Sequence, residues 1–196
     1  KVTENLSLEP VSEYNKSKII GERLLLSYKK YIDLVILRPA TVCGYSPSMR
    51  LDVTVNALTF GALKNKQIKV FGGKQIRPNL HMADMIKAYK FFINRKIKKN
   101  KTIDQTIFNV GFENISILNI AKTINKIIKV KSKILVQASN DPRSYRQNSN
   151  RLLKIGFKKD RNINDAIKEI EEKFYKNKVK YNNKFFRINT LKMIGK

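Results

Sequence analysis

Five stretches of the chain carry apolar residues every three or four positions, the spacing that places them on one face of an α-helix. They cover residues 12–30, 51–66, 84–92, 117–128 and 162–174. Ser12 and Asp84 are suited to cap the first and third of these helices, because a short polar side chain there accepts a hydrogen bond from a free backbone N–H. The pattern is clearest in the fourth stretch, which we expect to form the most strongly amphipathic helix.

Four short apolar runs alternate with these helices, bounded by proline, glycine or polar residues as β-strands are. They are DLVILRP, IKVFGG, TIFNVG and SKILVQA. In the first run Leu34–Leu37 are all apolar, which is typical of a strand that a parallel sheet buries on both faces. Helices that alternate with such strands predict an α/β fold built on a doubly wound parallel sheet, in which ligands bind beyond the carboxyl ends of the strands.

The charge of the chain points first to a polyanionic partner. Its formal net charge is +26, which alone favours nucleic acid or an anionic membrane. However, its 31 lysines and 10 arginines are spread over the whole chain, whereas nucleic-acid readers concentrate arginine and aromatic residues in one region. Lysine, asparagine and isoleucine make up 75 residues, the bias of AT-rich coding DNA. We therefore expect no nucleic-acid partner, and a basic surface that favours a small polyanion such as a nucleotide diphosphate.

Membrane and disulfide-rich classes are disfavoured as well. No apolar run approaches the roughly 18 residues that a membrane span needs, and the first ten residues lack the pattern of a signal peptide. The single cysteine, Cys43, allows no internal disulfide, which fits a reducing cytoplasm. We expect a folded cytoplasmic protein without a membrane partner.

Tyr14 and Lys18 stand four residues apart near the start of the first predicted helix, so their side chains share one face. A phenol is a poor base at neutral pH, but a neighbouring cation stabilises its phenolate form, and lysine supplies such a cation. In a lysine-rich chain the same spacing also arises from a buried tyrosine beside a solvated lysine. The spacing alone leaves both interpretations open.

The surroundings of this pair carry a family resemblance. PxSxYxxSK at its position is followed in order by LRPATVCGYSP, IKVFGGKQIRPNLHMADM, FNVG and DPRSYRQNSNRLLKIGF. In this order the segments resemble the C-terminal portion of the extended short-chain dehydrogenases/reductases, the NAD-dependent epimerases and dehydratases of nucleotide sugars. The resemblance runs from about Leu8 to Phe174 and is specific for the family but not for the substrate.

The resemblance implies a division of the chain and a set of ligands. Residues 1–45 would be the last part of an NAD-binding Rossmann domain, and residues 46–175 a small α/β substrate-binding region with elements that return to that domain. Residues 176–196 are basic, rich in asparagine and weakly patterned, so we expect a loosely ordered tail there. The implied cofactor is NAD or NADP, the substrate a nucleotide-diphosphate sugar, and the assembly a homodimer. Epimerisation, dehydration and reduction stay open as the reaction.

On the cofactor side the resemblance implies roles for three residues. Tyr14 would be the catalytic acid/base, exchanging a proton with a sugar hydroxyl as a hydride moves to or from the nicotinamide. Lys18 would assist Tyr14 and bind the nicotinamide ribose. Pro39, after the first strand, would border the nicotinamide. These three residues are the expected catalytic and cofactor-binding set.

On the substrate side the implied residues are Asn56, Arg77 and Arg143. Asn56 would face the nucleotide sugar. The two arginines would hold its diphosphate, because a guanidinium offers a planar fork of donors that matches phosphate oxygens. Without the family context, each arginine would be read as a surface residue. No zinc-type Cys/His spacing occurs, so we expect no metal site.

His81 and Cys43 are residue types that often act in catalysis, but we expect structural roles for both. His81, the only histidine, is expected at a strand end, where it would anchor the loop that carries Arg77. Cys43 stands where the family more often has tyrosine, and Thr41 where it often has asparagine. Cys43 is not expected to be a nucleophile, because no histidine lies near it in sequence.

The glycine-rich turn that binds the cofactor pyrophosphate in this family is missing, since the sequence contains neither GxxGxxG nor GxGxxG. In the family that turn lies well before the tyrosine and would fall upstream of Lys1. We therefore expect a fragment of a longer enzyme. Residues 1–196 alone would be inactive, poorly soluble and unable to bind NAD, because parallel strands without their neighbours expose apolar faces and edges.

Two other interpretations remain open from the sequence. The chain could be a basic, non-catalytic module that binds nucleic acid, with binding that depends steeply on salt and is indifferent to Tyr14. It could also be a degenerate relative that senses NAD without turnover. The first predicts that substitution of Tyr14 leaves binding unchanged, and the second predicts cofactor binding without turnover.

Overall fold

The computed structural model describes residues 1–10, 12–95, 102, 105–139, 141, 143–180, 182, 185 and 186. Its helices are α1 (Glu13–Ser27), α2 (Thr54–Asn65), α3 (Met82–Ile93), α4 (Ile117–Ile127), α5 (Asn150–Lys154) and α6 (Ile163–Tyr175). Its strands are β1 (Ile36–Pro39), β2 (Thr41–Cys43), β3 (Gln67–Phe71), β4 (Ile76–His81), β5 (Ile107–Val110), β6 (Glu113–Ser116) and β7 (Lys133–Gln137).

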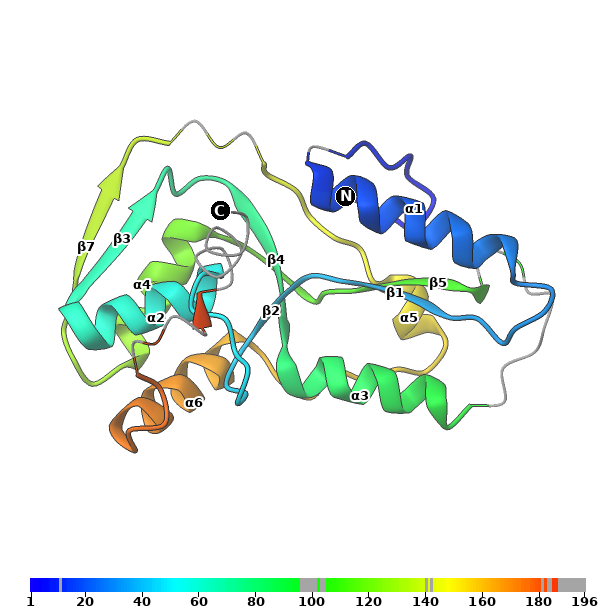
Figure 1. Cartoon of the computed structure of the whole chain (residues 1–196). Coiled ribbons are helices and arrows are strands. Elements are labelled where there is room, and N and C mark those ends of the chain that lie inside the picture. Colours follow the sequence, from blue (N-terminus) through cyan, green and yellow to red (C-terminus); the bar gives the residue numbers. More distant parts are fainter. Residues whose placement is uncertain are drawn as a thin grey trace.

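The elements form two halves joined by a three-stranded sheet (Figure 1). In one half β1 pairs in parallel with β5, with α1 on one side of the pair and α3 on the other. In the other half β3 pairs in parallel with β7, and α2, α4 and α6 pack beside them. Between the halves β4 pairs in parallel with β2 and antiparallel with β6. This arrangement confirms an α/β fold of the Rossmann type with parallel strand pairs and an additional small α/β region.

The larger hydrophobic core lies in the half that contains α2, α4 and α6. Helix α2 contributes most, since seven of its twelve residues are buried. Helix α6 starts with a capping box, in which the side chains of Asn162 and Asp165 each accept a hydrogen bond from the backbone N–H of the other residue. The fully buried isoleucines of this core are Ile68, Ile120, Ile124, Ile167 and Ile170. The predicted amphipathic helices therefore find partners for their apolar faces here.

A smaller core lies between the β1–β5 pair and α3 and α5. Phe92 and Phe108 contact each other with ring centroids 4.9 Å apart, and Leu152 of α5 is completely buried beside them. This core covers one side of the pair. The carboxyl end of β1 is followed directly by β2, the first strand of the three-stranded sheet.

The five predicted helices and the four predicted strands are confirmed, with one change at a helix start. Helix α3 is capped by the Nδ1 atom of His81, which accepts a hydrogen bond from Ala83 N at 3.1 Å. Asp84, the predicted cap, lies inside the helix, and its carboxylate accepts hydrogen bonds from the backbone N–H groups of Asp160 and Arg161. The pattern did not predict β2, β6 or α5, because three to five residues are too few to show a period. It did not predict β4 either, because its sequence IRPNLH contains a proline and no apolar run.

One expectation about burial is wrong within the described residues. The run Leu34–Leu37 was expected to be buried on both faces of a sheet. Leu34 is buried, but Ile36 and Leu37 are only half-buried. Their second face borders a groove of about 920 Å³ lined by apolar residues of α1 and α3, so it is not closed by packed side chains.

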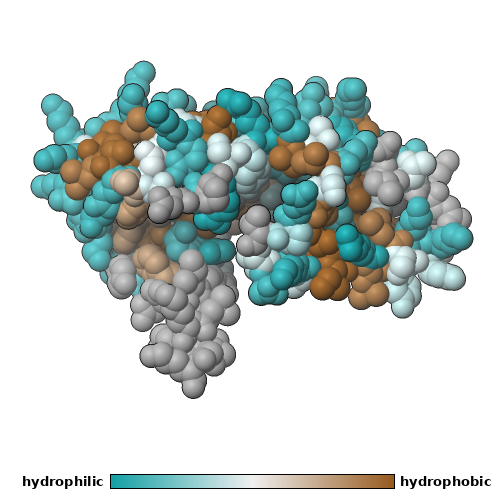
Figure 2. All heavy atoms as spheres, turned by 90° about the horizontal axis from the view of Figure 1, so that it is seen from above, coloured by the Kyte–Doolittle hydropathy of each residue, from teal (hydrophilic) through white to brown (hydrophobic). Residues whose placement is uncertain are grey.

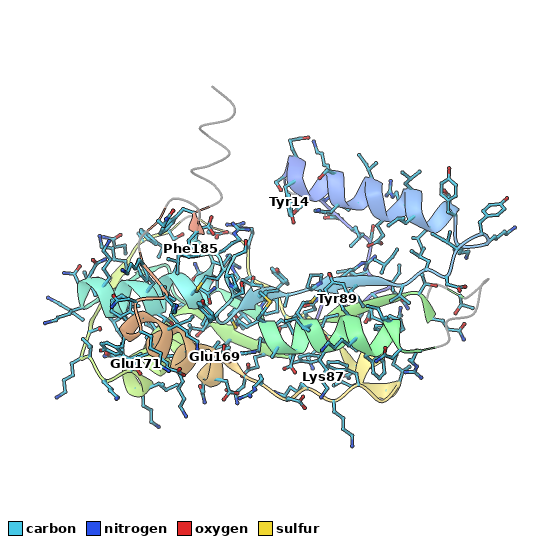
Figure 3. The ribbon with its side chains drawn as sticks, turned by 60° about the horizontal axis from the view of Figure 1, so that its bottom comes forward. Tyr14, Lys87, Tyr89, Glu169, Glu171 and Phe185 are labelled. Carbon is cyan, nitrogen blue, oxygen red and sulfur yellow. The ribbon has the colours of Figure 1, made fainter. Side chains whose placement is uncertain are left out.

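Helix α1 differs from every other helix of more than one turn that the structure describes, because it has no buried residue. Its apolar residues Ile20 and Leu24 are 65% and 59% exposed. Figure 3 shows this helix apart from the other helices, and Figure 2 shows apolar side chains at the surface in the half that carries it. Its side-chain link to the sheet is an ion pair, in which Arg38 of β1 donates from Nε to Glu22 at 2.9 Å.

The described part of the predicted basic tail is not loosely packed. Val179 and Phe185 are buried in the larger core, and the carbonyl of Phe185 accepts a hydrogen bond from Leu51 N at 2.8 Å. Residues 187–196 lie outside the described residues. In the part of the chain that the structure describes, no helix is long and apolar enough to cross a membrane.

Candidate active site

A cavity of about 750 Å³ opens where the two halves meet. It is bordered by the start of α1, by β2, by the segment before α2, by the start of β4 and by the segment after β7. Its lining residues are Asn15, Thr41, Asp52, Val53, Thr54, Arg77, Ile117, Asp141, Arg143, Ser144 and Tyr145. The cavity thus collects polar and charged side chains from segments that are far apart in sequence.

Tyr14 and Lys18 lie on one face of α1, as their spacing predicts. The ammonium of Lys18 is 5.3 Å from the centre of the Tyr14 ring, a cation–π contact. Ser12 holds the start of the helix by accepting a hydrogen bond from Asn15 N at 3.2 Å. The Tyr14 side chain is 69% exposed and stands at the end of α1 that faces the other half (Figure 3). Its hydroxyl is therefore accessible to a ligand.

Lys18 borders a second, smaller cavity of about 240 Å³. This cavity also contains Glu22 and Arg38, whose ion pair fixes α1 to β1. Asn15 lines both this cavity and the larger one. The two cavities are thus neighbours at the first turns of α1. Pro39 is exposed at the carboxyl end of β1 and lines neither of them.

Arg77 and Arg143 meet at the larger cavity, although 66 residues separate them in sequence. Arg77 Nη1 donates to the carbonyl of Arg143, and Arg77 Nη2 donates to Asp141 Oδ2 at 2.8 Å. Arg143 donates from Nε and Nη2 to the two carboxylate oxygens of Asp141, both at 2.8 Å. The predicted arginines are therefore brought together, with a carboxylate between them that the sequence interpretation missed.

The electrostatics of this group follow from its geometry. The two hydrogen bonds from the Arg143 guanidinium hold the pKa of the Asp141 carboxyl well below its ordinary range, with Arg77 adding to the effect. The same contact raises the pKa of Arg143. All three side chains are charged across the neutral range, so the cluster has one net positive charge. Such a pair of guanidinium forks suits a phosphate or diphosphate.

Asn56 is buried and uses both ends of its amide inside the protein. Its Oδ1 atom accepts a hydrogen bond from Gly44 N at 3.0 Å, and its Nδ2 atom donates to the carbonyl of Arg50 at 2.9 Å. It therefore fixes the loop between β2 and α2 and does not line the larger cavity. Its contact with a nucleotide sugar stays a prediction.

The same loop brings Asp52 to the cavity. Arg50 donates two hydrogen bonds to the Asp52 carboxylate, at 2.8 and 3.1 Å, and they raise the pKa of Arg50. Tyr145 adds a partly exposed aromatic ring to the cavity wall. The sequence carried one signal for such residues: Asp and Arg stand two positions apart both here and in DPR at Asp141 and Arg143.

His81 and Cys43 have structural environments. The buried His81 caps α3, and its Nε2 atom lies 3.3 Å from Glu169 of α6. Cys43 is buried, its Sγ lies 3.5 Å from the carbonyl of Leu80, and burial, helped by Glu113 and Glu169, raises its pKa to about 12. Its thiol is therefore protonated at neutral pH and is not a nucleophile. Among the described residues, no group of three or more acidic, His or Cys side chains is arranged to hold a metal ion.

Comparison with known proteins places the chain in a family. A sequence model of the NAD dependent epimerase/dehydratase family matches residues 1–111, more than half of the 196 residues. The chain belongs to this family. Within it, the uncharacterized UDP-glucose epimerase YtcB of Bacillus subtilis (strain 168) is 35% identical over 130 residues, which are 65% of this chain and 39% of that protein.

Solved structures agree with an epimerase/dehydratase fold. The UDP-glucuronic acid 4-epimerase of Bacillus cereus, in complex with UDP-glucuronic acid and NAD, has a TM-score of 0.72 and 25% identity, and the match covers 89% of this chain and 56% of that one. The UDP-glucose 4-epimerase of Thermotoga maritima has a TM-score of 0.75 at 19% identity, with 90% and 57% covered. This epimerase/dehydratase-family chain thus spans between about two fifths and three fifths of the length of these relatives.

Proposed function

We propose that the chain supplies the acid–base pair and the diphosphate-binding site of an enzyme that converts a nucleotide-diphosphate sugar with NAD or NADP. The observation that carries this proposal is the convergence of Arg77 and Arg143 at one cavity that Asn15, the neighbour of Tyr14, also lines. A diphosphate on the arginines would direct the attached sugar toward the start of α1. Epimerisation, dehydration and reduction share this requirement.

The substrate part of the proposal rests on charge and shape. A cavity of about 750 Å³ is within the range of small-molecule sites. Its guanidinium groups suit the diphosphate, and the Tyr145 ring offers an apolar surface for a base or a sugar. Relatives of the chain were solved with UDP-glucuronic acid or UDP-glucose, which supports a nucleotide sugar as the substrate here.

In the proposed mechanism Tyr14 exchanges a proton with a sugar hydroxyl while the carbon that carries this hydroxyl loses or gains a hydride. The exposure of the Tyr14 side chain permits this direct contact. Lys18 stabilises the phenolate from the same helix face. Arg77 and Arg143 hold the diphosphate, so that the sugar keeps its place during the transfer.

The cofactor fits the chain only in part. NAD(P), when bound, supplies the carbon that takes up and returns the hydride. The cavity beside Lys18, about 240 Å³, is smaller than a typical ligand pocket of about 300 Å³ or more, and suits a ribose rather than a dinucleotide. Lys18 would donate to that ribose and Pro39 would border the nicotinamide. The pyrophosphate would be held by a glycine-rich turn that these 196 residues do not contain.

The two hydrophobic cores support a division of the chain into a cofactor-binding half and a substrate-binding half. The smaller core joins β1 to α3, β5 and α5, which return to it from later in the chain. We assign this half to the Rossmann domain and the half with α2, α4 and α6 to substrate binding, with the boundary near residue 45. In this assignment the arginines belong to the substrate region and the Tyr14–Lys18 pair to the Rossmann domain.

The proposal is tested by Tyr14→Phe in the cofactor-binding enzyme. Loss of the phenol should lower kcat by about a hundredfold to ten-thousandfold, because proton transfer is lost, while NAD affinity stays within about twofold. Tyr31→Phe is the matched control, since this tyrosine follows α1 and is even more exposed. Near-normal turnover of Tyr14→Phe with a nucleotide sugar would exclude Tyr14 as the acid/base.

A further inference from the structure

Asp141 takes up the donors that the two arginines would offer to a diphosphate. Its Oδ1 atom accepts from Arg143 Nε, and its Oδ2 atom accepts from both Arg143 Nη2 and Arg77 Nη2, each at 2.8 Å. One full edge of the Arg143 fork is thus occupied by a carboxylate. A phosphate group needs the same edge for a bidentate contact.

The group is more than a casual surface ion pair. The Arg77 side chain is only 10% exposed and that of Asp141 only 25%. Asp141 Oδ1 also accepts a hydrogen bond from Arg143 N at 3.1 Å, and Asp141 N donates to Ser139 Oγ at 3.2 Å. The carboxylate is therefore held between the two guanidinium groups by the backbone of Arg143, while Ser139 holds the main chain of Asp141.

We propose that Asp141 is an internal anion that occupies the binding site formed by Arg77 and Arg143, and that the diphosphate of a substrate must displace it. The inference rests on the proposed function, because that function assigns the arginines to a diphosphate. Asp141 lowers the affinity of the site for every anion by competition and by repulsion. Small anions such as inorganic phosphate then bind poorly, and a diphosphate that has additional contacts through its base and sugar is selected.

Competition and a purely structural role of Asp141 predict opposite changes in the affinity for anions when Asp141 is removed. If Asp141 merely braced the arginines, its removal would loosen them and weaken anion binding. If it competes, its removal frees the Arg143 fork and strengthens anion binding. The direction of the change in affinity therefore separates the two roles.

The experiment measures the Kd of inorganic pyrophosphate for the purified cofactor-binding enzyme that contains this chain, by isothermal titration calorimetry. Asp141→Asn should bind pyrophosphate about fivefold more tightly than the unaltered chain, the size expected for losing a partly exposed ion pair. Asp160→Asn is the matched control: it removes the same charge from an exposed pair with Lys87, away from the cavity, and should change Kd by less than about twofold.

A second variant, Asp141→Ser, removes a contact with Arg143 that Asp141→Asn could keep. Asn keeps an acceptor oxygen near Arg143, whereas Asp141→Ser shortens the side chain and should strengthen pyrophosphate binding at least as much as Asp141→Asn. Circular dichroism melting checks that each variant is folded. If both variants bind pyrophosphate equally well or more weakly than the unaltered chain, Asp141 is a brace and the inference is overturned.

Arg143→Gln separates this inference from the proposed function. The proposed function and the inference both predict that Arg143→Gln weakens pyrophosphate binding. The inference also predicts that Asp141→Asn no longer strengthens pyrophosphate binding when it is combined with Arg143→Gln. Weaker binding by Arg143→Gln without a gain in Asp141→Asn overturns the inference and leaves the diphosphate site standing. Unchanged binding in Arg143→Gln overturns the diphosphate site and the inference together.

Discussion

Helices α1 and α6 are of similar length and both begin with a side-chain cap, yet they relate to the rest of the protein in opposite ways. Helix α6 buries five of its thirteen residues, whereas α1 buries none of its fifteen. Both were predicted from apolar residues at helical spacing. The difference shows that amphipathic spacing predicts a helix but does not identify the surface that covers its apolar face.

The two groups of proposed site residues also differ in how well the elements that carry them are packed. Arg77 lies on β4, in the sheet that joins the two halves, and its side chain is only 10% exposed. The Tyr14–Lys18 pair is positioned by a helix that depends on one ion pair with β1. The proposed anion site thus includes the mostly buried side chain of Arg77, whereas the proposed acid–base pair stands on a helix without buried residues.

The largest expected effect comes from the same substitution in the two helices. Ile167→Ala in α6 should lower the free energy of unfolding by about 3 kcal/mol, because it leaves a cavity in a closed core. Ile20→Ala in α1 should change it by less than about 0.5 kcal/mol, since this side chain is mostly solvated. Urea unfolding of both variants measures the comparison. Equal losses would mean that α1 is packed as tightly as α6.

A smaller effect is expected from the ion pair that holds α1. Arg38→Gln leaves the carboxylate of Glu22, whose side chain is 13% exposed, without its partner, and should cost about 2 kcal/mol. Arg50→Gln breaks the pair with Asp52, in which the carboxylate is 11% exposed but the arginine is 46% exposed, and should cost less, about 1 kcal/mol.

Hydrogen exchange locates the loss, since Arg38→Gln should speed exchange in α1 and leave α4 unchanged. A matching acceleration in α4 would contradict the independence of α1. The double variant Arg38→Gln with Glu22→Gln should recover part of the loss, because no unpaired charge remains.

The helix caps give the next comparison. Asn162→Ala removes one side of the capping box of α6 and should lower the free energy of unfolding by about 1 kcal/mol. Ser12→Ala removes the cap of α1 and should alter local helix formation, but the global transition by only a few tenths of a kcal/mol. Chemical denaturation together with hydrogen exchange at Asn15 distinguishes the two. A full loss of global stability in Ser12→Ala would show that α1 unfolds with the core.

The smallest expected effect is a pH dependence at the start of α6. Burial raises the pKa of the Glu113 carboxyl above its ordinary value of 4.5, although the N–H of Ile163 opposes this by donating to it at 2.7 Å. The folded state then binds this proton more tightly than the unfolded state. The contribution of Glu113 to stability therefore falls as pH rises from about 4.5 through the raised value.

Glu113→Gln should remove this dependence and keep an acceptor for Ile163. Urea unfolding between pH 4 and pH 7 should show that the variant loses less stability with rising pH than the unaltered chain. A steeper loss in the variant would mean that the charge of Glu113 stabilises α6. At the start of α1, the contacts of the described residues include no strand carboxylate that accepts a backbone hydrogen bond as Glu113 does at the start of α6.

Most of the fold could be predicted from the sequence, because the long elements carry clear periods. In α4 the core buries Ile120, Ala121 and Ile124, which follow the helical spacing. The short strands β2 and β6 could not be predicted, since they are held by pairing with β4 rather than by their own pattern. The half-buried faces of Ile36 and Leu37 could not be predicted either, because burial depends on neighbouring elements and not on the strand.

The site could be predicted in part for a similar reason. Tyr14 and Lys18 are neighbours on one helix, so their spacing predicts their proximity. The meeting of Arg77 with Arg143 depends on how β4 lies beside the segment after β7, and local patterns carry no such information. Asp141 was missed because an acidic residue next to an arginine is ordinary in a charged sequence.

The long sequence separation within the arginine cluster has a consequence for folding. Arg77 and Asp141 are 64 residues apart, so their contact forms only after β4 and the distant segment have met. An anion that binds there recognises the folded chain and not the unfolded one, and it stabilises the folded chain by mass action. The cluster can therefore serve as an internal reporter of tertiary structure: a rise in melting temperature with pyrophosphate would signal that β4 and the segment after β7 have met.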